Sequence, residues 1–107
     1  MPVTISRGRS DKIVKRLAAA LMEYEKQNPA AEISLYRHNS VSVRIRIIDP
    51  SFQKLDRPDR HAKVWSFLEN LPDEAEGDIS MLALMTPNEV ANSVANVEFD
   101  NPIPSKL

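Results

Sequence analysis

Hydrophobic residues spaced three and four apart predict a first helix over residues 11–27. The apolar positions share one face of this helix; they are Ile13, Val14, Leu17, Leu21 and Tyr24. We expect Ser10 to be the N-cap, with Asp11 in the first turn favouring the helix dipole. The pair Asn28-Pro29 predicts the end, because a residue before proline disfavours the helical conformation.

Polar and apolar residues then alternate in two segments, 32–35 and 41–47, which predicts a β-hairpin. The polar stretch Arg37-His38-Asn39-Ser40 between them is typical of a short turn. The predicted inner face comprises Ile33, Leu35, Val41, Val43, Ile45 and Ile47. The predicted outer face, which we expect to meet water, comprises Glu32, Ser34, Ser42, Arg44 and Arg46.

A second helix is predicted over residues 59–70, ending before Pro72. Its apolar face would consist of His61, Val64, Trp65, Leu68 and Leu71, which places His61 on the buried side. Residues 79–85 carry apolar side chains at both odd and even positions, which predicts a strand whose two faces are both covered. The capping-box pattern Thr86-Pro87-Asn88-Glu89 predicts a short helix directly afterwards.

The order helix, strand, strand, helix, strand, helix predicts an α+β fold. A strand–helix–strand crossover is nearly always right-handed, so the third strand should run parallel to the second. We therefore expect a three-stranded mixed sheet with helices packed on one face. Residues 10–92 would form a single domain, residues 1–9 a loose N-terminal arm, and residues 93–107 a C-terminal tail. This tail would be either loose or an extended segment added to a sheet edge or a partner.

The composition of the 107-residue chain excludes several kinds of covalent bond, nucleophile and metal site. It has no Cys and two His, which excludes disulfides, thiolate nucleophiles and sulphur-ligated metal sites built by the chain alone. No arrangement typical of a nucleophile and base is evident, and we expect no enzymatic activity. Neither a long apolar run nor the apolar core of a signal peptide is present, so we expect a soluble, cytoplasmic protein.

Charge is distributed unevenly although the formal net charge is −1. Residues 1–48 hold nine basic and four acidic side chains, and residues 49–107 hold five basic and eleven acidic ones. Either one surface is basic and suits an acidic partner, or the opposite charges interleave once the chain folds.

Three stretches resemble the BolA-like proteins in sequence and in order along the chain. They are the hairpin segment Tyr36-Arg37-His38-Asn39, the strand end Ile47-Ile48-Asp49-Pro50-Ser51-Phe52, and the pair Arg60-His61 at the start of a helix. The resemblance covers approximately residues 11–90, and the hairpin loop is shorter here than is usual in that family.

This resemblance implies a non-enzymatic adaptor or regulator that pairs with a monothiol glutaredoxin in handling an iron–sulphur cluster. His61 and His38 would be the candidate ligands, because imidazole can replace thiolate on iron. The sulphur ligands would come from glutaredoxin and glutathione, so the cluster would be shared and not bound by this chain alone.

Two alternatives remain open. BolA-like proteins are similar in topology to class II KH domains, which implies nucleic-acid binding through a basic surface. The candidate residues are Arg7, Arg9, Lys12, Lys15, Arg16, Arg44 and Arg46. The other alternative is a protein-interaction or homodimer module that uses the sheet face, a strand edge or the apolar tail.

Overall fold

The chain folds around a four-stranded mixed sheet with the strand order β1-β2-β3-β4. A computed structural model describes residues 3–7 and 10–104, except for the side chains of Ser6 and Arg7. The strands are β1 (Thr4–Arg7), β2 (Glu32–Asn39), β3 (Ser42–Ile48) and β4 (Ile79–Met85). Strands β2 and β3 are antiparallel, whereas β1 is parallel to β2 and β4 is parallel to β3.

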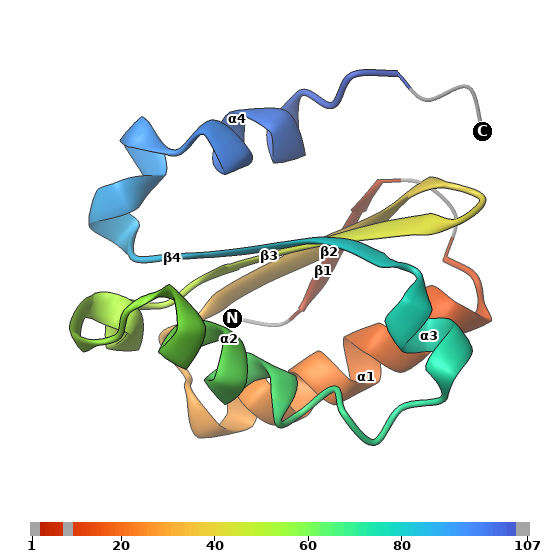
Figure 1. The fold of residues 1–107 in the computed structure, drawn as a ribbon, viewed down its shortest axis with the longest axis horizontal. Helices are drawn as coiled ribbons and strands as arrows, with labels where there is room; N and C mark the ends of the chain where they lie inside the picture. Colours follow the sequence, from red (N-terminus) through yellow and green to blue (C-terminus); the bar gives the residue numbers. More distant parts are fainter. Residues whose placement is uncertain (1–2, 8–9, 105–107) are drawn as a thin grey trace.

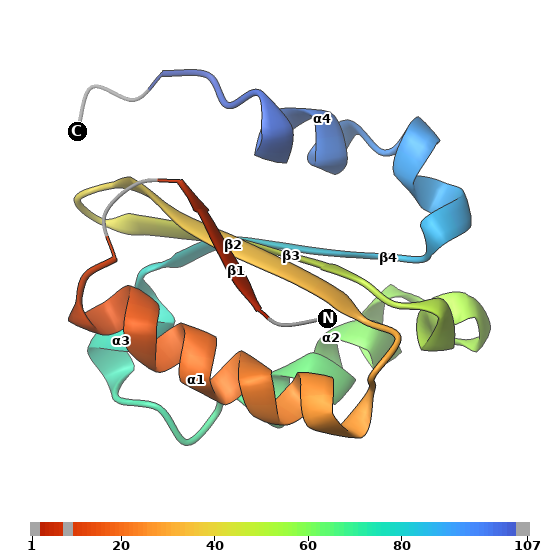
Figure 2. The ribbon, with the colours of Figure 1, turned by 180° about the vertical axis from the view of Figure 1, so that it is seen from behind.

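Helices cover both faces of this sheet (Figures 1 and 2). One face carries α1 (Lys12–Gln27), α2 (Arg57–Trp65) and α3 (Asp73–Gly77). The other face carries α4 (Val94–Asp100). Two 3₁₀ segments, η1 (Pro50–Lys54) and η2 (Pro87–Asn92), follow β3 and β4 respectively. None of the helices in the described residues has the length and apolarity needed to cross a membrane.

The α+β class and the parallel pairing of β3 with β4 are confirmed, but the prediction of three strands is wrong. The sequence Thr4-Ile5-Ser6-Arg7 is too short to show an alternating pattern, and its strand conformation depends on pairing with β2. The prediction that helices cover only one face is also wrong, because α4 lies over the opposite face (Figure 1).

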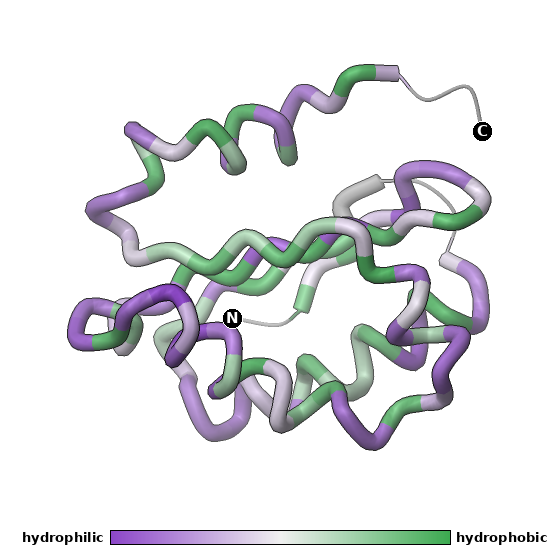
Figure 3. Tube along the Cα trace, in the orientation of Figure 1, coloured by the Kyte–Doolittle hydropathy of each residue, from purple (hydrophilic) through white to green (hydrophobic). Residues whose placement is uncertain are grey.

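The core lies between the sheet and α1, as the alternating pattern predicted. Hydrophobic residues gather along the strands between the helical layers (Figure 3). The buried side chains from α1, β2 and β3 include Val14, Leu17, Leu21, Tyr24, Ile33, Leu35, Val43, Ile45 and Ile47. Val41 was expected among them but is 54% exposed, because it lies in the two-residue turn between β2 and β3.

Three predicted boundaries shift for reasons visible in the hydrogen bonds. Asp11, not Ser10, caps α1, because its Oδ1 accepts from the backbone N–H of Val14 at 2.9 Å. Asp56 caps α2 in the same way, so that helix begins at Arg57 and not at residue 59. The helix ends at Trp65, before the predicted residue 70. Strand β2 continues to Asn39 because its ladder with β3 extends almost to the turn.

The C-terminal segment is ordered and helical, whereas the sequence predicted a loose or extended tail. The Tyr36 hydroxyl donates to the carbonyl of Phe99 at 2.7 Å, and the Phe99 ring is buried against the Tyr36 ring. Arg44 and Arg46 form ion pairs with Glu98 and Asp100 at 3.0 and 2.7 Å. These contacts hold α4 on the sheet, so the arginine side of β3 is covered and not open to water.

Candidate functional site

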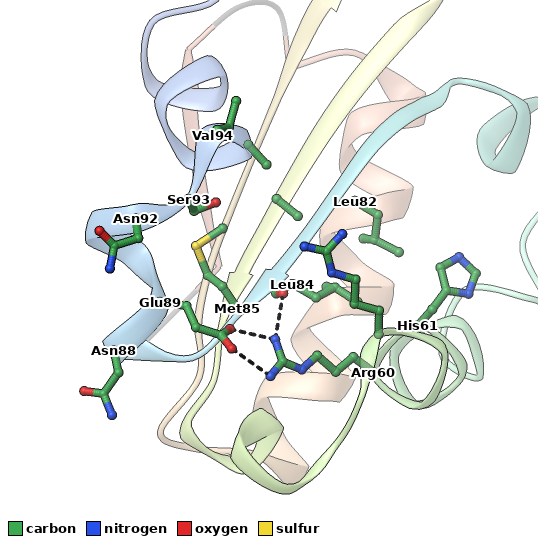
Figure 4. A pocket seen from close by; sticks show the side chains of 13 residues that line it. Arg60, His61, Leu82, Leu84, Met85, Asn88, Glu89, Asn92, Ser93 and Val94 are labelled. Carbon is green, nitrogen blue, oxygen red and sulfur yellow. Dashed lines mark hydrogen bonds and ion pairs between the residues drawn. The ribbon is translucent and has the colours of Figure 1, made fainter.

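A groove of about 740 Å³ lies along the outer edge of β4 (Figure 4). It is bounded by the start of α2 on one side and by η2 with the start of α4 on the other. Its polar lining side chains are Arg57, Arg60, His61, Asn88, Glu89, Asn92 and Ser93. Its apolar lining comes from Leu82, Ala83, Leu84, Met85, Val94 and Ala95.

Strand β4 is the last strand of the sheet, so one of its edges has no strand partner among the described residues. The carbonyl of Met85 accepts from the N–H of Asp49, which shows that Met85 directs its backbone toward the β3 side. Backbone groups alternate along a strand, so Leu82 and Leu84 direct theirs toward the groove. The Leu84 carbonyl indeed accepts from the Arg60 guanidinium at 3.3 Å. The floor of the groove therefore presents main-chain donors and acceptors.

Arg60 joins three elements beneath the groove. Its guanidinium donates to the carbonyls of Leu55 and Leu84 at 3.0 and 3.3 Å, and to both carboxylate oxygens of Glu89 at 2.7 and 3.0 Å. This contact lowers the pKa of Glu89 to about 2, with help from the backbone N–H of Thr86 that donates to the same carboxylate. Glu89 also raises the pKa of Arg60. The fork-shaped pair fixes η2 relative to α2 (Figure 4).

His61 is exposed at the side of the groove, so its predicted place on the buried face of α2 is wrong. The buried side chains of this helix are Arg60 and Val64, four residues apart. The guanidinium of Arg60 also lies over the Phe52 ring at 5.6 Å, so its stem takes the buried position expected for His61. The His61 ring stacks on Trp65, with centroids 5.3 Å apart and planes at 16°. Stacking orients the imidazole while leaving it accessible.

His38 lies near the hairpin end of β2, on the face that carries α4. Its ring contacts Tyr36 edge-on at a centroid distance of 6.4 Å. Burial lowers the pKa of His38, and the Arg44 charge lowers it further, while Glu98 opposes both effects. Since α2 covers the other face, the structure does not bring His38 and His61 together. Within the described ranges, no cluster of three or more His, Asp or Glu could hold a metal ion.

The predicted basic residues fall on two separate surfaces. Lys12 and Lys15 are exposed and Arg16 is half-buried on α1. Arg44 and Arg46 lie beneath α4, where carboxylates already bind them. The side chain of Arg7 and the whole of Arg9 lie outside the described residues.

Sequence reasoning named His61 but missed Arg60, Glu89 and the open edge of β4 as parts of one site. The spacing of Arg60, Val64 and Leu68 carried a usable signal, because residues four apart share a helix face. The position of β4 at the sheet edge depends on long-range pairing, which leaves no local signal.

The chain matches no protein-family model, no curated protein and no solved structure.

Proposed function

We propose that the protein is a cytoplasmic, non-enzymatic adaptor of the BolA-like type that binds a protein partner at the β4 groove. The supporting observation is His61, which is exposed at the groove and oriented by Trp65. A side chain that is both accessible and held in one orientation suits a ligand or contact residue, because little entropy is lost when it binds.

The partner that we propose is a monothiol glutaredoxin carrying an iron–sulphur cluster. The chain has no cysteine, and His61 stands apart from His38, so this protein would contribute one imidazole. The thiolates would come from the glutaredoxin and from glutathione. Replacing a thiolate by a neutral imidazole raises the reduction potential of such a cluster.

The test is titration of a cluster-loaded monothiol glutaredoxin with the purified protein, followed by visible absorption and circular dichroism. We expect a spectral change that saturates at a fixed ratio, and loss of that change in His61→Ala. His38→Ala serves as the matched control, since it removes the other imidazole from the opposite face of the sheet. No spectral change with the wild-type protein, or an effect of His38→Ala equal to that of His61→Ala, would contradict the proposal.

A further inference from the structure

We infer that the β4 groove takes its partner by strand addition: an extended, acidic peptide segment pairs with the outer edge of β4. This inference rests on the proposed function, because it specifies how the partner-binding groove makes contact. It depends on the backbone of Leu82 and Leu84, on the charge of Arg57, and on the absence of charge, proline or bulge in the part of β4 that lines the groove.

The backbone groups carry the pairing. Leu82 and Leu84 direct their N–H and C=O groups into the groove, and an added strand satisfies such groups with main-chain hydrogen bonds. Arg60 already donates to the Leu84 carbonyl at 3.3 Å. This bond marks one end of the available edge, so the segment should pair with Leu82 and with the N–H of Leu84.

Over the groove-lining residues Leu82 to Met85, strand β4 has no charge, proline or bulge that would prevent edge pairing; its irregularity with β3 lies at its start, between Ile79 and Met81. Exposed edges are usually very short or carry charged residues or proline. The other edge strand, β1, has only four residues, whereas β4 has seven, and its sequence ISMLALM contains neither a charge nor a proline. An edge of this length and composition within a groove favours a binding role for β4.

Charge selects an acidic segment. The groove is lined by two guanidinium groups and one carboxylate, and that carboxylate is bound to Arg60. Arg57 is exposed, and its guanidinium forms no ion pair with any other residue that the structure describes. It lies at the first turn of α2, beside the floor of the groove. A carboxylate on the added segment would complete the pairing that Arg57 lacks.

The experiment uses fluorescence anisotropy with dye-labelled, eight-residue peptides of alternating aspartate and valine. We expect saturable binding, and loss of binding when lysine replaces aspartate or when alternate peptide nitrogens are methylated. The Arg57→Glu variant should bind at least about tenfold more weakly, which corresponds to about 1.4 kcal/mol. Lys54→Glu changes the net charge equally at an exposed residue outside the groove and should bind as the wild type does.

Three results would overturn the inference. If the lysine peptide binds as tightly as the aspartate peptide, the groove does not select an acidic segment. If the methylated peptide binds as tightly as the unmethylated one, the segment does not pair through its main chain. A stable dimer in light scattering that Leu82→Pro abolishes would show that a second copy occupies the edge; Leu82→Ala, which keeps the backbone N–H, is its control. If the peptides fail while glutaredoxin still gives a His61-dependent spectral change, only this inference fails; if both fail, so does the proposed function.

Discussion

Replacing Arg60 by methionine tests whether the guanidinium beneath the groove joins α2, β4 and η2. Methionine keeps an unbranched apolar stem against Phe52 but removes every donor. The Arg60 side chain is 10% exposed, and its guanidinium bonds two backbone carbonyls and the Glu89 carboxylate. The substitution therefore removes polar contacts among three elements with little loss of apolar packing.

The expected loss of stability can be worked from these contacts. A hydrogen bond contributes about 1 kcal/mol net, and more when one partner is charged. The ion pair contributes only about 1 kcal/mol, because the Glu89 side chain is 46% exposed and solvent screens it. Two carbonyl bonds and one screened pair together give about 3 kcal/mol, which corresponds to a fall of roughly 15 °C in Tm for a domain of this size.

Urea unfolding followed by far-ultraviolet circular dichroism measures this loss. Arg57→Met is the matched control, because Arg57 lies on the same helix but is exposed. Its effect should stay within about 0.5 kcal/mol. Equal midpoints for the two variants would refute the reasoning and show that the Arg60 contacts do not contribute to stability.

Three further predictions concern pH and buried polar groups. The pKa of Glu89 is about 2 in the folded protein against 4.5 ordinarily, so its contribution to stability is full above about pH 4.5 and disappears toward pH 2. The urea midpoints of wild type and Glu89→Gln should therefore converge as the pH falls through that range. Tyr24→Phe should cost about 2 kcal/mol in urea unfolding, because the buried hydroxyl donates to the buried Asp49 carboxylate at 2.6 Å. Glu98→Gln should lower the pKa of His38 further in an NMR titration, since the Glu98 charge stabilises the imidazolium; an unchanged or raised pKa would contradict this contact.

Local periodicity predicted the elements whose own residues form the core. The α1 stripe from Val14 to Tyr24 and the alternation from Val43 to Ile47 identify their structures, because each buries one continuous face. Strand β1 has no such face and forms only by pairing with β2. Periodicity therefore could not show the fourth strand.

The site was only partly predictable because similar helical faces compete at α2. His61, Val64 and Leu68 fit a helical stripe, and so do Arg60, Val64 and Leu68, since positions three and four apart share a face. A hydropathy argument prefers histidine to arginine at a buried position. Glu89, 29 residues away in sequence, reverses that preference by neutralising the guanidinium.

In the fold, basic side chains of the first half of the chain pair with acidic side chains of the second half. Arg37 binds Asp78, Arg44 binds Glu98 and Arg46 binds Asp100, so each pair joins the basic half to the acidic half. The alternative in which opposite charges interleave is confirmed at these three places. Two of these pairs join α4 to β3 and add to the burial of Phe99 in holding a segment with few apolar residues on the sheet.

Two of these ion pairs hold α4, and the start of α4 lines the groove. Phe99 is the buried side chain of α4, whereas Val94 is 84% exposed, so one apolar anchor and the ion pairs of Arg44 and Arg46 together hold the helix. Exposed and half-buried ion pairs are weak and are screened by salt, which places α4 among the less stable parts of the fold. Because Val94 and Ala95 form one wall of the groove, any movement of α4 changes the groove width. Loss of the Arg44 or Arg46 ion pair would therefore reach the groove through α4, since neither arginine lines it.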